Sequence, residues 1–285
     1  MAKVAVVTDS TAYIPSETMD GYPVYSAPLQ LIWGEQTYRD GVDITPTEFY
    51  ERLPQAKVTP TTSQATPAAF NEIYQKLLDE GYEILSVHLS GKLSGTLDSA
   101  TQAKENFPGA KIALIDTETT AMAMGFQVLA AARAAKQGAS LEECVGLMEQ
   151  MRGKTGVLFV VSNLEFLRRG GRIGGAQAFL GTALNLKPIL ELRGGKIEAV
   201  ERVRTMSKAI DRLIDLFEER IGDRRPIRIA SLHAAAPEEA RLLLERTRQR
   251  FSEDEVVETV YSEISPVLGT HTGPGTIGLA YMAGM

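Results

Sequence analysis

The stretch that decides the fold is Ile84-Leu-Ser-Val-His-Leu-Ser-Gly-Lys-Leu-Ser-Gly-Thr96. Its first six residues form a short apolar run, which is typical of a buried strand, and residues 97–107 can form a helix. The turn between the two is made of serine, glycine, lysine and threonine with one leucine. A strand that passes through a short turn into a helix is the unit from which parallel sheets with helices on both faces are built.

The same alternation extends to both sides of this stretch. Strands are predicted at residues 3–8 and 111–115, and an alanine- and methionine-rich helix at residues 119–136. Thr66-Pro67 is a favourable helix start, because it places a hydroxyl at the N-cap and a proline at the first helical position. The first part of the chain is therefore expected to hold a mostly parallel sheet flanked by helices.

The pattern changes after Arg152-Gly-Lys154. A strand is predicted at residues 157–161 and a helix at 176–185. Residues 189–192 and 197–203 flank Arg193-Gly-Gly195, which signals a hairpin. Further helices are expected at residues 208–221 and 237–251, and further strands at 227–232 and 256–261. We predict an α/β protein of two domains, an N-terminal α/β domain at residues 1–153 and a mixed α/β domain at residues 154–285.

Composition excludes several classes of protein. The chain has 285 residues and a net charge of −6, which argues against a general nucleic-acid binder. Cys144 is the only cysteine, so an internal disulfide and a cysteine-rich metal site are ruled out. No apolar stretch approaches the roughly 20 residues that span a bilayer. Because the N-terminal apolar run is also too short for a signal peptide, a cytoplasmic location is expected.

Positive charge is concentrated in one window, residues 166–208. It holds nine basic residues and three acidic ones, which suggests a local anionic partner. An ordinary solvated surface explains the same composition equally well.

Three segments rich in hydroxyls and glycine are the candidates for a binding site: residues 59–67, residues 90–96 and the glycine-rich loop that contains His271. Loops that follow the strands of an open α/β sheet are where such proteins bind ligands, and a helix start favours an anion. A structural explanation is also open, since Ser94-Gly-Thr96 of the second segment can simply cap a helix. The glycines of residues 90–96 lack the Gly-Lys-Ser/Thr ending of a phosphate-binding loop, and no Gly-x-Ser-x-Gly nucleophile elbow occurs.

The motifs in their order resemble the DegV family along essentially the whole chain. The resemblance is carried by Val7-Thr-Asp-Ser-Thr11, Tyr38-Arg-Asp-Gly-Val-Asp-Ile44, Glu48-Phe-Tyr50, Thr59-Pro-Thr-Thr-Ser-Gln64, Leu93-Ser-Gly-Thr96, Leu167-Arg-Arg-Gly-Gly-Arg-Ile173, Leu186-Lys-Pro188, Val203-Arg-Thr205 and His271. One departure is Leu97-Asp98, where the family often has an aromatic residue and a glutamine.

The resemblance implies a fatty-acid-binding protein that holds one long-chain acyl carboxylate in a buried pocket. It implies carboxylate contacts from Thr61, Thr62, Ser94, Gly95 and His271, and a role for Arg172 and Arg204 toward the head group or a partner. That partner would be a separate ATP-dependent fatty acid kinase, which makes an acyl-phosphate. No cofactor and no catalytic residue are expected in this chain. Met122, Met124, Phe126, Phe179 and Leu180 could line the pocket or belong to the plain core.

Two other functions remain open from the sequence. One is an enzyme that acts on a small anionic metabolite, with the basic window as its anion site. The other is a regulatory protein whose bound lipid is only structural.

Overall fold

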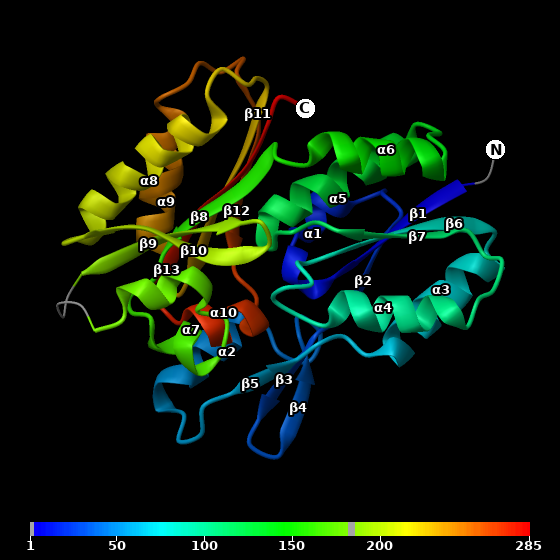
Figure 1. Cartoon of the computed structure of the whole chain (residues 1–285), viewed down its shortest axis with the longest axis horizontal. Helices are drawn as coiled ribbons and strands as arrows, with labels where there is room; N and C mark the ends of the chain where they lie inside the picture. The colour runs from blue at the N-terminus through cyan, green and yellow to red at the C-terminus, as the bar shows by residue number, and fades with distance from the viewer. Residues whose placement is uncertain (1–2, 182–185) are drawn as a thin grey trace.

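The computed structural model describes residues 3–181 and 186–285. It contains three β-sheets with helices packed around them (Figure 1). The first sheet is entirely parallel, in the order β2-β1-β6-β7. Its strands are Val24–Ala27, Lys3–Asp9, Tyr82–His88 and Ile112–Asp116.

Helices cover both faces of this first sheet, as the strand–helix alternation predicted. Helices α3 (Pro67–Asp79) and α4 (Thr96–Glu105) pack on one face, and α5 (Ala121–Lys136) and α6 (Leu141–Met151) on the other. Strand β1 shows the alternation, since Ala5 and Val7 join the core under α3 while Val4 and Val6 join the core under α5. Helix α3 begins at the predicted N-cap, where the Thr66 hydroxyl accepts a hydrogen bond from the backbone N–H of Ala69.

The second sheet is mixed and has the order β10-β9-β8-β13-β11-β12. In that order its strands are Lys196–Val203, Lys187–Arg193, Thr155–Val160, Thr276–Ala283, Ile227–Ala234 and Val256–Glu263. Strands β11 and β12 are parallel, whereas the other pairs are antiparallel, including the predicted β9–β10 hairpin.

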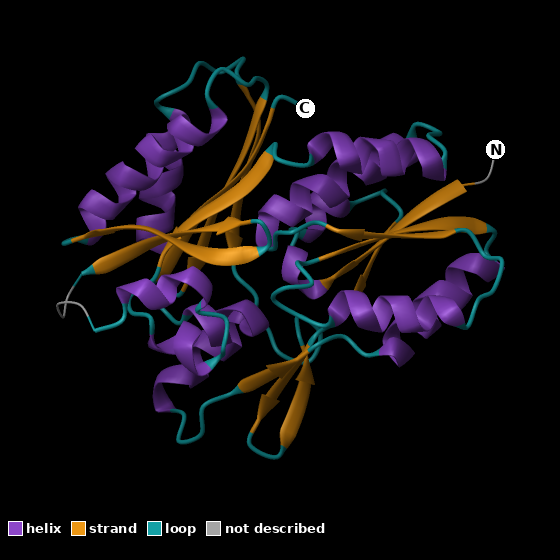
Figure 2. Ribbon diagram, viewed as in Figure 1, coloured by secondary structure: helices purple, strands orange, loops and turns teal. Residues whose placement is uncertain are grey.

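One face of the second sheet packs against helices α8 (Met206–Ile221) and α9 (Pro237–Arg248). The opposite face turns toward α5, which lies between the two large sheets (Figure 2). Residues on successive positions of β13 alternate between these faces, so that Leu279 joins the core under α8 and Ala280 joins the core beside α5.

A third, small antiparallel sheet has the order β4-β3-β5 and lies at the bottom of Figure 1. Its strands are Gln36–Arg39, Gln30–Trp33 and Thr61–Ser63. Helices α2 (Pro46–Arg52), α7 (Glu165–Arg169) and α10 (Pro266–Thr272) lie close by in the same view. The remaining short elements are α1 (Ser16–Met19) and 3-10 turns at Ser10–Ala12, Leu53–Gln55 and Gly174–Phe179.

The α/β fold class is confirmed, with a parallel sheet flanked by helices and a second, mixed sheet. The domain boundary near Gly153 stays a prediction. Gly153 lies between the end of α6 and the start of β8. The largest apolar core extends across this point, because it joins α5 and α6 to Val157, Leu232 and other residues of the second sheet.

Two local predictions were wrong. His271 does not sit in a loop but on helix α10. Residues 174–179 form a 3-10 turn in place of the start of the helix predicted at 176–185, and residues 182–185 of that prediction lie outside the described residues. Strand β13 was not predicted at all, although it is the buried centre of the second sheet.

None of the helices in the described parts of the chain is long and apolar enough to cross a membrane.

Candidate functional site

A cavity of about 230 Å³ lies where the three sheets meet. A water molecule takes up roughly 30 Å³ in the liquid, so this space is far larger than a packing defect. Its wall is mostly apolar and draws on distant parts of the chain, including Leu89 after β6, Phe159 of β8, Leu232 of β11 and Leu268 of α10. A mostly apolar cavity with a few polar groups is the usual form of a small-molecule site.

The polar part of the wall contains four of the five residues predicted to bind a carboxylate. Thr62, Ser94, Gly95 and His271 all line the cavity. They come from β5, from the turn that starts α4 and from α10. The fold thus brings together side chains separated by as many as 209 positions in the sequence, as in the pair Thr62–His271.

Thr61 is the predicted residue that the fold does not bring to the cavity. It lies in β5 next to Thr62, but it is exposed and does not line the cavity. Neighbouring residues of a strand point to opposite sides, which is why only one of the two threonines can turn its side chain inward here.

His271 and Thr62 form a hydrogen-bonded pair. The ring atom Nε2 of His271 lies 2.8 Å from Oγ1 of Thr62. Burial lowers the pKa of His271 from 6.5 to about 4, with a smaller contribution from the positive charge of Arg172. The ring is therefore neutral at neutral pH and carries one N–H. With its proton on Nε2, His271 donates to Oγ1 of Thr62 and leaves the threonine hydroxyl free to donate to an anion.

The other ring nitrogen of His271 faces Gly170. Nδ1 is buried and has no hydrogen-bond partner among the described residues. A Cβ atom at position 170 would lie 2.1 Å from Nδ1, far inside contact distance. Only glycine at position 170 therefore lets the imidazole occupy its present place.

Arg172 also lines the cavity and joins two parts of its wall. Its guanidinium donates to the carbonyl of Leu93 at 3.0 Å and to that of Gly170 at 2.7 Å. It thus connects the turn before α4 to the segment that supports His271. The same cation favours an anion in the cavity and disfavours protonation of His271.

Ser94 and Gly95 lie at the start of α4, whose first turn presents backbone N–H groups and the positive end of the helix dipole. Oγ of Ser94 lies 2.9 Å from Oγ1 of Thr96 and accepts from the Thr96 N–H at 3.3 Å. The Gln64 side chain packs against Gly95, where a Cβ would come within 2.2 Å of its Oε1. The absence of a side chain at position 95 therefore brings the helix start and the β5 segment into contact.

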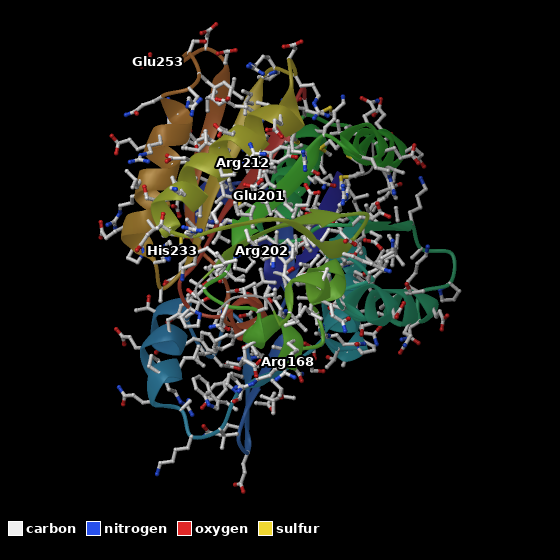
Figure 3. The ribbon with its side chains drawn as sticks, turned by 60° about the vertical axis from the view of Figure 1, so that its left-hand side comes forward. Arg168, Glu201, Arg202, Arg212, His233 and Glu253 are labelled. Carbon is white, nitrogen blue, oxygen red and sulfur yellow. The ribbon has the colours of Figure 1, made fainter. Side chains whose placement is uncertain are left out.

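The other basic residues of the window do not line the cavity. Arg204 is exposed just after β10, does not line the cavity, and forms no ion pair with a described residue. The nearby acid Glu201 binds Arg212 at 2.9 Å, and Figure 3 shows these two side by side. The two arginines that the sequence grouped together are thus separated, with Arg172 at the cavity and Arg204 on the surface.

Several cavity residues were missed from the sequence. Ser63, Gln64 and Thr120 line the cavity. The first two belong to the segment already singled out, and Thr120 follows a predicted strand and begins a helix, which are signals that could have identified it. The five residues suggested as pocket lining, in contrast, are not part of the cavity wall; Met122, Met124 and Phe126 are wholly buried in the core, and Phe179 and Leu180 lie elsewhere.

Within residues 3–181 and 186–285, no cluster of three or more histidine, cysteine or acidic side chains is arranged to hold a metal ion.

Comparison with known proteins gives a consistent result. The model of the DegV family, described as a family of uncharacterised proteins, matches residues 3–284. A DegV domain-containing protein of Streptomyces coelicolor is 42% identical over 277 residues, which are 97% of each chain. A fatty-acid-binding DegV family protein from Thermus thermophilus has a similar structure, with a TM-score of 0.92, 38% identity and 99% of each chain covered. DegV of Bacillus subtilis, a fatty-acid-binding protein, has a TM-score of 0.89 and 36% identity, with 99% of this chain and 100% of that one covered.

Proposed function

Because the chain belongs to the DegV family, we propose that it binds one long-chain fatty acid in the cavity between its sheets. The observation that carries the proposal is the composition of the cavity wall, in which Thr62, Ser94, Gly95 and His271 form a polar group on an otherwise mostly apolar surface. A fatty acid has the same two parts, one carboxylate and a long apolar chain.

The carboxylate would accept hydrogen bonds from the hydroxyls of Thr62 and Ser94. A buried carboxylate is costly unless donors replace its water, and charge-assisted hydrogen bonds are the strongest that the site can offer. The neutral His271 would act by orienting the Thr62 hydroxyl, and Arg172 would supply positive charge nearby. Gly95 would contribute through the start of α4.

The acyl chain would supply most of the affinity. Each buried methylene contributes about 0.8 kcal/mol, so a chain of about 15 methylenes gives roughly 12 kcal/mol before the costs of binding. The apolar wall formed by Leu89, Phe159, Leu232 and Leu268 is suited to such a chain.

The chain would act as a carrier that presents the fatty acid to a separate ATP-dependent kinase. The cavity offers hydroxyls, an amide and a neutral imidazole, and a carboxylate needs no more than these to be held without reaction. The positive charge that lies outside the cavity, including Arg204, would serve the kinase or the developing acyl-phosphate, because an arginine fork matches phosphate oxygens.

The binding proposal is tested by extracting the purified protein with organic solvent and searching the extract for a long-chain fatty acid by mass spectrometry. Replacing Ser94 with alanine removes one hydrogen bond to a charged group, which should cost about 1.5–3 kcal/mol, or roughly one to two decades in affinity for palmitate. The matched control is Ser16→Ala, since Ser16 is exposed on α1 and does not line the cavity. Wild-type affinity in the Ser94→Ala protein would refute this carboxylate site.

The presentation proposal is tested with Arg204→Ala and the fatty acid kinase of the source organism. We expect near-normal palmitate binding and strongly reduced formation of acyl-phosphate, because the exposed cation would meet the kinase and not the bound lipid. The control is Lys57→Ala, which removes one exposed positive charge outside the basic window. Unchanged acyl-phosphate formation in the Arg204→Ala protein would assign the kinase contact to another surface. A loss of palmitate binding would make Arg204 structural or a direct ligand contact.

A further inference from the structure

Thr120 is a polar residue of the cavity wall that none of the interactions described so far uses. It lines the cavity and is only 8% exposed. Its hydroxyl oxygen is buried and has no hydrogen-bond partner among the described residues. Buried hydroxyls are nearly always hydrogen-bonded in folded proteins, so an unpaired one calls for an explanation.

The helix that Thr120 begins does not use this hydroxyl. Thr120 is the N-cap of α5, a position where threonine normally accepts a hydrogen bond from the first turn. Its side chain makes no such bond. The backbone at Thr120 is fully extended, with φ −159° and ψ −173°, a conformation that valine adopts as readily as threonine.

Thr120 also stands on a different element from the polar residues of the proposed carboxylate site. Those residues come from β5, the α4 start and α10, whereas α5 packs against β8, β11 and β13 of the second sheet. The cavity residues on these strands include Val157, Leu232 and Gly278, which have no polar side chain. They also include Thr276 of β13, but its hydroxyl is already used, since it donates to the backbone carbonyls of Thr272 and Gly273. The next residue, Ala121, shares an apolar core cluster with Val157 and Leu232. The Thr120 side chain would therefore lie beside the acyl chain.

We propose that Thr120 hydrogen-bonds a hydroxyl group carried on the acyl chain, so that the cavity binds a hydroxylated long-chain fatty acid more tightly than the unsubstituted acid of the same length. A rotation about the Cα–Cβ bond exchanges the hydroxyl and methyl positions of threonine between staggered rotamers. A ligand hydroxyl thus draws the Thr120 oxygen toward the cavity and satisfies it. This inference rests on the proposed fatty-acid binding and adds the class of acyl chain that the cavity selects.

The test is to measure dissociation constants for stearate and for a series of stearates that carry one hydroxyl at successive chain positions. Wild type and Thr120→Val are compared, because valine keeps the shape of threonine and removes only the hydroxyl. We expect one or two neighbouring positional isomers to bind wild type about tenfold more tightly than stearate does. This preference disappears in Thr120→Val, while the affinity for stearate stays the same or rises.

Thr119→Val is the matched control. Thr119 precedes Thr120, is 5% exposed, and also has a buried hydroxyl without a described partner, but it does not line the cavity. Its replacement should leave the preference intact. An equal loss of affinity for all acids in Thr120→Val would overturn the inference by placing Thr120 at the carboxylate. An unchanged preference in Thr120→Val, or equal binding of every isomer by wild type, would also overturn it, whereas failure of wild type to bind any of these acids would refute the proposed function itself.

Discussion

Replacing Gly170 with alanine should weaken fatty-acid binding without removing any polar group from the cavity. Gly170 has φ −73° and ψ −7°, which alanine adopts without strain, and its hydrogen bonds to Phe166 and Arg172 involve only backbone atoms of residue 170. The added Cβ, however, would lie 2.1 Å from Nδ1 and 2.9 Å from Cε1 of His271. Non-bonded atoms normally approach to about 3.5 Å, so the ring must retreat by more than about 1 Å.

This retreat determines the size of the effect. The Nε2–Oγ1 distance between His271 and Thr62 is 2.8 Å, and a displacement of this size carries it beyond hydrogen-bonding range. The Thr62 hydroxyl then loses the donor that orients it toward the ligand. Loss of one well-placed charge-assisted hydrogen bond costs about 1.5–3 kcal/mol, so we expect the dissociation constant for palmitate to rise about 10- to 100-fold.

The assay is isothermal titration calorimetry with delipidated protein, accompanied by thermal unfolding to confirm that the variant is folded. The control is Gly146→Ala on α6, where an added Cβ meets no atom within 4 Å. It should leave the affinity unchanged and stabilise the protein slightly. Gly170→Ala protein that is folded and binds palmitate as wild type does would refute the role assigned to His271.

Two further predictions follow from individual residues. Thr62→Val should lower palmitate affinity by about one decade, whereas Thr61→Val should not change it by titration calorimetry, because only Thr62 faces the cavity. Equal losses of palmitate affinity in both variants would mean that any substitution in β5 weakens binding and that the Thr62 hydroxyl has no special role. Burial raises the pKa of Asp40 from 3.8 to about 7, despite its hydrogen bond from Ser10. The folded state therefore keeps a proton that the unfolded state releases above about pH 4, and the Asp40 contribution to the free energy of unfolding falls as pH rises from about 4 to 7. In urea unfolding, the free energy of unfolding of Asp40→Asn should rise relative to that of wild type by on the order of 4 kcal/mol between about pH 4 and pH 7. A difference in free energy of unfolding that stays constant over this range would contradict the raised pKa of Asp40.

The sequence predicted the strands and helices whose pattern of apolar and polar residues is clear. Strand β6 is a short apolar run between polar turns, and α8 carries one apolar face, so both were recognised. Strand β13 was missed because all of its eight residues are buried, which leaves no alternation to detect, and because it contains Gly278 among its small residues. The small sheet was missed for a different reason, since its strands have three or four residues each and depend on contacts with distant segments.

The candidate site was predictable as a set of residue types but not as a geometry. The hydroxyl-rich segments gave Thr62, Ser94 and Gly95, yet the sequence could not tell Thr61 from Thr62, because strand β5 was not recognised. His271 was singled out for its glycine-rich surroundings, although it lies on a helix. Its dependence on Gly170 could not be predicted, since that contact joins residues 101 positions apart and arises only in the folded chain.

The central claim is that a fatty-acid carboxylate lies among Thr62, Ser94 and His271. A crystal structure of the protein saturated with palmitate tests it most directly. We predict a carboxylate oxygen within about 3.2 Å of both Oγ1 of Thr62 and Oγ of Ser94, with Nε2 of His271 still bonded to Thr62 and the acyl chain in the apolar part of the cavity. Palmitate bound in the reverse direction, at another place on the protein, or not at all would contradict the account.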